Sequence, residues 1–86
     1  MNRTDPELQE MVAEASINAE VAQLIYEART LAGLTQQQLA NLIGTKQSVI
    51  ARLEDADYQG HSLAMLQRIA QTLNQRLEIH LTAIER

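Results

Sequence analysis

The chain has 86 residues, enough for one domain with a modest core. It contains no cysteine, which excludes disulfides and thiolate metal sites, and no phenylalanine or tryptophan, which favours a core of aliphatic side chains in packed helices. The net charge is −4 and no apolar stretch is long enough to span a membrane, so we expect a cytoplasmic protein without a membrane partner.

The negative charge is concentrated near the N-terminus. Residues 1–20 contain one arginine and five acidic residues, whereas residues 21–86 contain six basic and six acidic residues. Binding to nucleic acid depends on the local field at the contact surface, and a neutral body can still present a basic face. The overall charge therefore does not exclude a DNA-binding protein.

The first predicted unit is an acidic extension over residues 1–18, either a short helix starting at Pro6 or a disordered segment. Because Asn18 is a good N-cap residue, the pattern predicts a break there and a new helix from about Ala19. The extension carries an apolar stripe at helical spacing: Leu8, Met11, Val12 and Ala15.

Residues 19–75 show the period of four further helices. The first ends at Gly33, the second lies between the N-cap Thr35 and Gly44, the third runs from Thr45 or Lys46 to about Asp55, and the fourth runs from the N-cap Ser62 to Asn74. The apolar residues assigned to their buried faces are Val21, Leu24, Ile25, Ala28, Leu31, Leu39, Leu42, Ile43, Val49, Ile50, Leu53, Leu63, Leu66, Ile69, Ala70 and Leu73.

The period changes in residues 76–86, where Leu77, Ile79 and Leu81 alternate with polar residues as in a β-strand. A lone strand in a helical domain needs a hydrogen-bonding partner, and the same strand of a second subunit supplies one. The pattern therefore predicts a homodimer that pairs through this strand. The alternative is an extended tail that lies on its own helices.

The stretch from Thr35 to Glu54 has the residue choices of two short helices joined by a tight turn. A small residue, Ala40, stands where the helices approach most closely, and Gly44 suits a positive φ in the turn. Two apolar anchors, Ile50 and Leu53, point back between the helices.

This stretch resembles the helix-turn-helix of phage repressors and Cro proteins, known as the XRE family. The matching residues are Leu34 to Gln36, Leu39, Ala40, Gly44 to Ser48, Ile50, Leu53 and Glu54. The resemblance covers residues 19–75 and implies a mainly α, compact domain of four to five helices, here with a short C-terminal strand. It implies a transcriptional repressor that places the second helix of the motif in the major groove of double-stranded DNA.

The resemblance assigns base readout to Lys46, Gln47, Ser48 and Arg52. The Gln47 amide matches the N7 and N6 edge of adenine, and Arg52 can contact guanine or a phosphate. Contacts with the DNA backbone are assigned to Thr35, Gln36 and Thr45. Gln36 is also expected to brace the base-reading glutamine. Arg29 and Glu54 match two positions that form a structural ion pair.

One departure from the family pattern concerns the residues that follow the third helix. Asp55 and Asp57 add two carboxylates near the DNA-facing end, and they would repel phosphate unless they point aside.

Within the family, the chain is most similar to small HigA-like antitoxins. The similarity is carried by the N-terminal extension, by residues 58–63 and by residues 77–81. It implies a small basic toxin as partner and autoregulation through a near-palindromic operator. The candidate toxin-binding residues are Leu8, Met11, Val12 and Ala15.

Two other functions stay open: a stand-alone, phage-type repressor without a toxin, and a protein-interaction module without DNA readout. An enzyme is not expected, because the chain shows no catalytic residues and no phosphate-binding glycine loop. His61 and His80 have no neighbouring ligands at metal spacing, so neither a metal nor a cofactor is expected.

Overall fold

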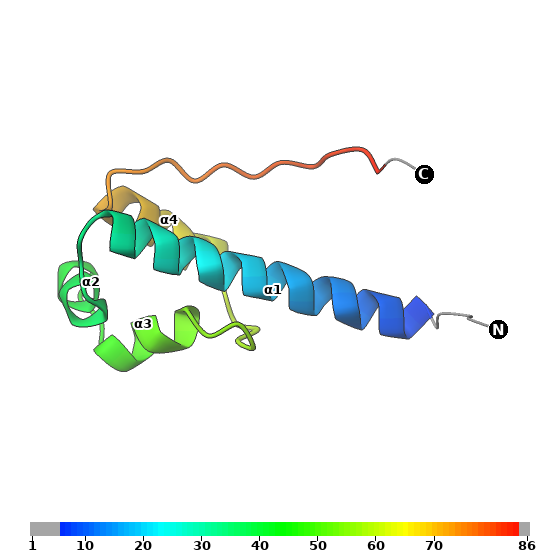
Figure 1. Ribbon diagram of the computed structural model, residues 1–86. Helices are drawn as coiled ribbons and strands as arrows, with labels where there is room; N and C mark the ends of the chain where they lie inside the picture. The colour runs from blue at the N-terminus through cyan, green and yellow to red at the C-terminus, as the bar shows by residue number, and fades with distance from the viewer. Residues whose placement is uncertain (1–5, 85–86) are drawn as a thin grey trace.

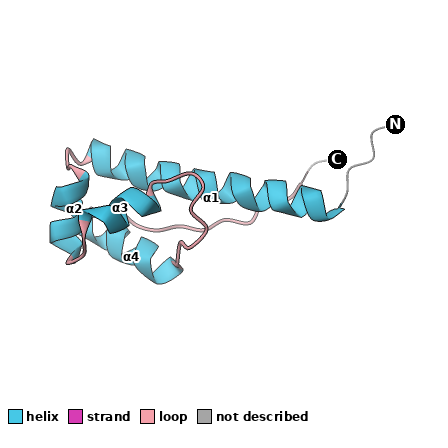
Figure 2. Ribbon diagram, turned by 90° about the horizontal axis from the view of Figure 1, so that it is seen from below, coloured by secondary structure: helices cyan, strands magenta, loops and turns pink. Residues whose placement is uncertain are grey.

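Four helices make up the fold of the computed structural model, which describes residues 6–84 (Figures 1 and 2). They are α1 (Pro6–Leu31), α2 (Gln36–Ile43), α3 (Gln47–Leu53) and α4 (Leu63–Thr72). The predicted order of helices in residues 19–75 is confirmed. Within residues 6–84, no helix is both long enough and apolar enough to cross a membrane.

The longest helix, α1, corrects the predicted break near Asn18, because it continues through its 26 residues without interruption. No glycine or proline follows Pro6 within it, and single polar residues inside a helix cost only about 0.5 kcal/mol each. Residues 6–18 are therefore helical and are not a separate short element. The N-terminal half of α1 extends beyond the other three helices (Figure 1). Residues 1–5 of the predicted extension lie outside the described residues.

The turn between α2 and α3 has the predicted local chemistry. The hydroxyl of Thr35 accepts a hydrogen bond from the backbone N–H of Gln38 (3.1 Å), and the Gln38 side chain accepts one from the backbone N–H of Thr35 (2.8 Å). Gly44 ends α2 with φ 87°, and its N–H donates to the carbonyl of Ala40 (2.9 Å). A positive φ strains any residue with a Cβ, so the glycine fixes the angle at which α3 leaves α2.

The core is small and lies where α1, α2, α3 and α4 meet. Its buried apolar residues are Ala22, Ile25, Leu39, Ala40, Ile43, Ile50, Leu53 and Ile69. The assignment of buried residues was wrong for Leu24, Leu31, Leu42 and Leu63, whose side chains are exposed. The helices carry more apolar residues than this core covers, and burial is decided by which face meets a neighbouring helix.

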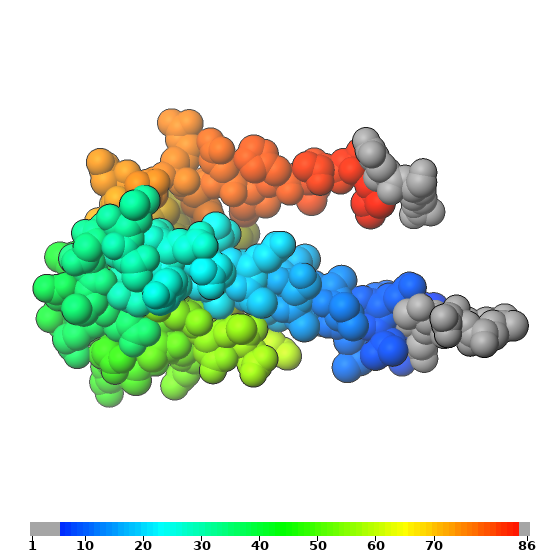
Figure 3. Space-filling model, in the orientation of Figure 1, coloured from blue at the N-terminus to red at the C-terminus, as the bar shows by residue number. Residues whose placement is uncertain are grey.

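The C-terminal segment does not form the predicted strand. Residues 75–84 have no regular secondary structure and run beside α1 as an extended chain (Figures 1 and 3). A strand requires a hydrogen-bonded neighbour, and the described part of a single chain provides none for residues 76–84. Between this segment, α1 and α4 lies an open apolar groove of about 430 Å³.

Candidate nucleic-acid interface

Three of the four residues assigned to base readout stand at the N-terminal end of α3, and the fourth, Arg52, lies in its last turn. Lys46 is the N-cap residue and Gln47 begins the helix. Ser48 and Arg52 are four residues apart and so share one face of the helix. All four side chains are exposed. Because α3 is held to α2 by the buried Ile50 and Leu53, this polar end has a fixed position on the domain.

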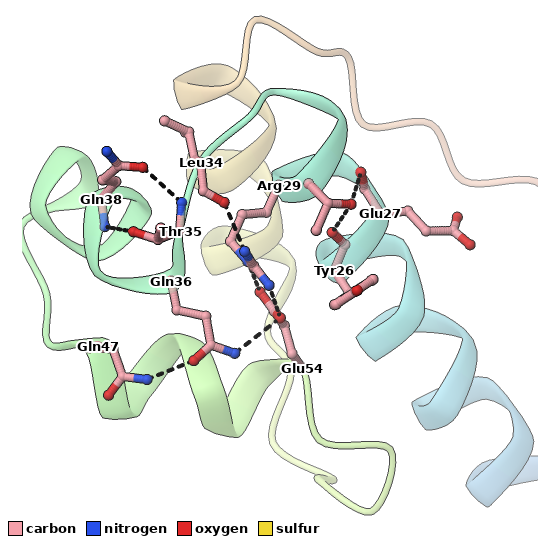
Figure 4. Close-up of polar contacts among 10 residues, drawn as sticks. Tyr26, Glu27, Arg29, Leu34, Thr35, Gln36, Gln38, Gln47 and Glu54 are labelled. Carbon is pink, nitrogen blue, oxygen red and sulfur yellow. Dashed lines mark hydrogen bonds and ion pairs between the residues drawn. The ribbon is translucent and has the colours of Figure 1, made fainter.

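Two glutamines join α2 and α3 across the front of the motif (Figure 4). The side-chain Nε2 of Gln47 donates to Oε1 of Gln36 at 2.6 Å. Nε2 of Gln36 in turn donates to Oε1 of Glu54 at 3.2 Å. The structure thus shows the brace that the resemblance implied for Gln36, and it adds a contact with Glu54 that was not expected from the sequence.

The carboxylate of Glu54 is held by Arg29 from the end of α1 (Figure 4). Arg29 Nε donates to Oε2 at 2.7 Å and Nη2 donates to Oε1 at 2.9 Å, in the two-point geometry typical of a strong pair. The third nitrogen, Nη1, donates to the backbone carbonyl of Leu34 at 2.8 Å, and the guanidinium lies 5.3 Å from the ring centre of Tyr26.

The pair is almost completely enclosed, since Arg29 is only 8% exposed. The hydrogen bond to Glu54 raises the pKa of Arg29 above its ordinary value, against the opposing effect of burial. Arg29 therefore stays charged, and it serves to position Glu54 while remaining inaccessible to DNA.

The residues assigned to contacts with the DNA backbone flank the surface formed by α3. Thr35 is exposed, with its hydroxyl oxygen engaged in capping α2, and Thr45 is half-buried in the turn. Asp55 and Asp57 are exposed in the loop after α3, where a carboxylate oxygen of Asp55 accepts a hydrogen bond from the backbone N–H of Asp57 (2.9 Å).

The loop between α3 and α4 secures the far end of α3 through residues that were not predicted from the sequence to belong to the site. Nε2 of His61 donates to the carbonyl of Leu53 at 2.7 Å, and its ring meets the edge of Tyr58. A Cβ on Gly60 would overlap the hydroxyl end of the Tyr58 ring, so the ring would have to shift to accommodate any other residue. The aromatic residue and the glycine in this otherwise polar loop were the features of the sequence that could have identified these residues. Within residues 6–84, no cluster of His, Asp and Glu could hold a metal ion.

Comparison with known proteins agrees with this geometry. The family model of helix-turn-helix proteins matches residues 25–79, which include α2, α3, α4 and the Arg29 end of α1. A search of curated proteins found no match. The fold, with α3 exposed on the domain, defines a helix-turn-helix domain of the DNA-binding, regulatory type. The chain belongs to the helix-turn-helix family, of the XRE type, and is a sequence-specific DNA-binding regulator of transcription.

Proposed function

We propose that the chain is a transcriptional repressor that inserts α3 into the major groove as a homodimer and reads bases with Lys46, Gln47, Ser48 and Arg52. The observation that carries the proposal is the 2.6 Å bond between Gln47 and Gln36, which holds an exposed amide at the tip of α3. The bond joins the two helices of the motif, whereas the bond between Gln37 and Asn41 lies within α2. Thr35, Gln36 and Thr45 lie beside it and contact the phosphates.

The test uses DNA duplexes selected by the wild-type protein from a pool with a randomised segment. Gln47→Ala is expected to weaken binding to the best duplex at least tenfold while leaving the melting temperature unchanged, since Gln47 is exposed. Gln37→Ala is the matched control, because Gln37 lies on α2 and bonds to Asn41 (2.8 Å) instead of to α3. Equal binding by wild type and Gln47→Ala would remove Gln47 from the site.

The C-terminal segment supports the proposed homodimer. Leu81 is 99% exposed and Ile79 is also exposed, while Leu77 lines the groove between the segment and α1. The backbone of residues 76–84 has no hydrogen-bonding partner within the described chain. Pairing with the same segment of a second copy satisfies these groups and covers the apolar side chains.

Sedimentation of the full chain at micromolar concentration tests this pairing. The dimer is expected to become monomeric when Ile79 and Leu81 are both changed to Asp, and affinity for the near-palindromic operator is expected to fall with it. Changing the alternate residues Glu78 and His80 to Ala is the control, since their side chains point to the other side of an extended chain. A dimer that survives the aspartates would place the interface elsewhere.

We further propose that the chain is an antitoxin that binds a small basic toxin through the N-terminal half of α1. Leu8, Met11, Val12 and Ala15 are exposed there, on a helix that projects beyond the body and carries most of the acidic excess. An apolar stripe with an acidic surround suits a basic protein partner. In this arrangement α1 binds the toxin while α3 remains free to bind the operator.

Co-purification with the product of the neighbouring reading frame tests the antitoxin role. Complex formation is expected for the wild type and for Gln9→Ser with Ala13→Ser, which lie on α1 outside the apolar stripe. It is expected to be lost in Met11→Ser with Val12→Ser. If no complex forms with the wild type while operator binding persists, the protein is a stand-alone repressor. A complex without any DNA binding would indicate an interaction module.

A further inference from the structure

Gln47 is the last member of a chain of polar contacts that begins in the interior (Figure 4). This series of contacts runs from the enclosed pair of Arg29 and Glu54, through the half-buried Gln36, to the exposed Gln47. The Arg29 and Glu54 side chains are 10% and 5% exposed. Only the outer members can therefore touch DNA.

The direction of every hydrogen bond in this chain is fixed by its inner end. Arg29 has only donors, and the Glu54 carboxylate has only acceptors. Gln36 must therefore turn its NH2 group toward Glu54, which leaves its carbonyl oxygen toward α3. Gln47 must then turn its NH2 group toward Gln36, as the 2.6 Å contact shows. The carbonyl oxygen of Gln47 consequently faces outward (Figure 4).

The orientation of this amide matters for reading a base. The last torsion of a glutamine side chain has two nearly equivalent orientations, related by a half turn that exchanges the oxygen and the nitrogen. Adenine presents one acceptor and one donor in a fixed order in the major groove. A glutamine held in one orientation matches that order, whereas an unheld one also presents the reverse order and accepts other bases.

We propose that Glu54 sets the base preference of Gln47, acting through Gln36, and is a positioning residue for DNA readout although its enclosed carboxylate does not reach DNA. The expected effect of Glu54 on base preference rests on the proposed function. Its effect on the Gln47 amide is a property of the free protein, and the two are measured separately.

The free protein is measured first, by two-dimensional NMR of the glutamine side-chain NH2 groups. Glu54→Gln keeps the size of residue 54 and introduces a donor, so residue 54 no longer dictates the direction of the hydrogen bonds that lead to Gln47. The NH2 resonances of Gln47 are expected to shift although residue 54 does not contact Gln47. Gln37→Ala is the control and is expected to leave them in place. Unchanged Gln47 resonances in Glu54→Gln would overturn the proposal.

The second measurement is base preference, at the operator position whose preference Gln47→Ala abolishes. At this position, wild type is expected to bind a duplex with an A·T pair about tenfold more tightly than a duplex with a T·A pair. Glu54→Gln is expected to reduce this ratio severalfold. Gln36→Ala, which leaves the ion pair intact and guards against poor folding of the first variant, is expected to reduce it likewise. Equal weakening on both duplexes in both variants would show that Glu54 and Gln36 do not set the preference.

If the wild type selects no duplex at all, the proposed function fails. The NMR result then decides by itself whether Glu54 orients Gln47.

Discussion

Glu54→Ala is expected to be among the most destabilising single substitutions near the surface of this domain. It removes contacts of 2.7 and 2.9 Å from Arg29 and one of 3.2 Å from Gln36. Leaving one member of a buried ion pair unpaired costs about 3–5 kcal/mol. Arg29 keeps its bond to the carbonyl of Leu34, and water can enter beside the half-buried Gln36, which reduces the expected loss to about 2–3 kcal/mol.

For a domain of this size, that loss lowers the melting temperature by about 10–20 °C. Urea and thermal unfolding followed by circular dichroism measure it, with Glu20→Ala as the control because Glu20 is an exposed acid on α1. Combining Arg29→Met with Glu54→Leu is expected to recover more than half of the loss, since no charge is then left unpaired. A loss below about 0.5 kcal/mol for Glu54→Ala would refute the view that this pair holds α1 to the motif.

Four further substitutions probe separate parts of the molecule. Ile50→Ala, at a fully buried position, is expected to cost about 2–5 kcal/mol in urea unfolding. Gly44→Ala is expected to cost about 1–2 kcal/mol, because φ is 87° and no neighbouring atom obstructs the new methyl group. Gly60→Ala displaces the Tyr58 ring and is expected to cost about 1–3 kcal/mol, and a neutral result would contradict the packing of that loop. Lys46→Ala is expected to reduce the salt dependence of operator binding by about one unit of slope, leaving stability unchanged.

The sequence predicted the helix ends of the motif well, because each end depends on one or two adjacent residues. Thr35 and Ser62 cap α2 and α4 as expected, and Gly44 and Asn74 adopt the positive φ that ends a helix. Such signals are local, so they do not depend on how the domain packs.

Burial was harder to predict, because α1 carries apolar residues on more than one face. Ala22 and Ile25 meet the core, whereas Leu24, more than a third of a turn from the face they define, is exposed and lines the groove. The helical period is the same for both faces, and only the position of the neighbouring helices distinguishes them. The uninterrupted course of α1 through Asn18 was missed for a related reason, since a capping residue permits a helix to begin but does not require it.

In the site, the sequence indicated the individual residues and the structure adds how they depend on one another. Gln36 and Glu54 are 18 residues apart, and no periodic pattern links them, yet their contact joins the ion pair to the exposed amide. The inner half of this chain has the burial of a structural element and the outer half the exposure of a binding surface. A substitution at Glu54 should therefore change both stability and base preference, whereas one at Gln47 should change base preference alone. Gln36→Ala separates the two effects, because it breaks the connection while leaving Arg29 and Glu54 paired.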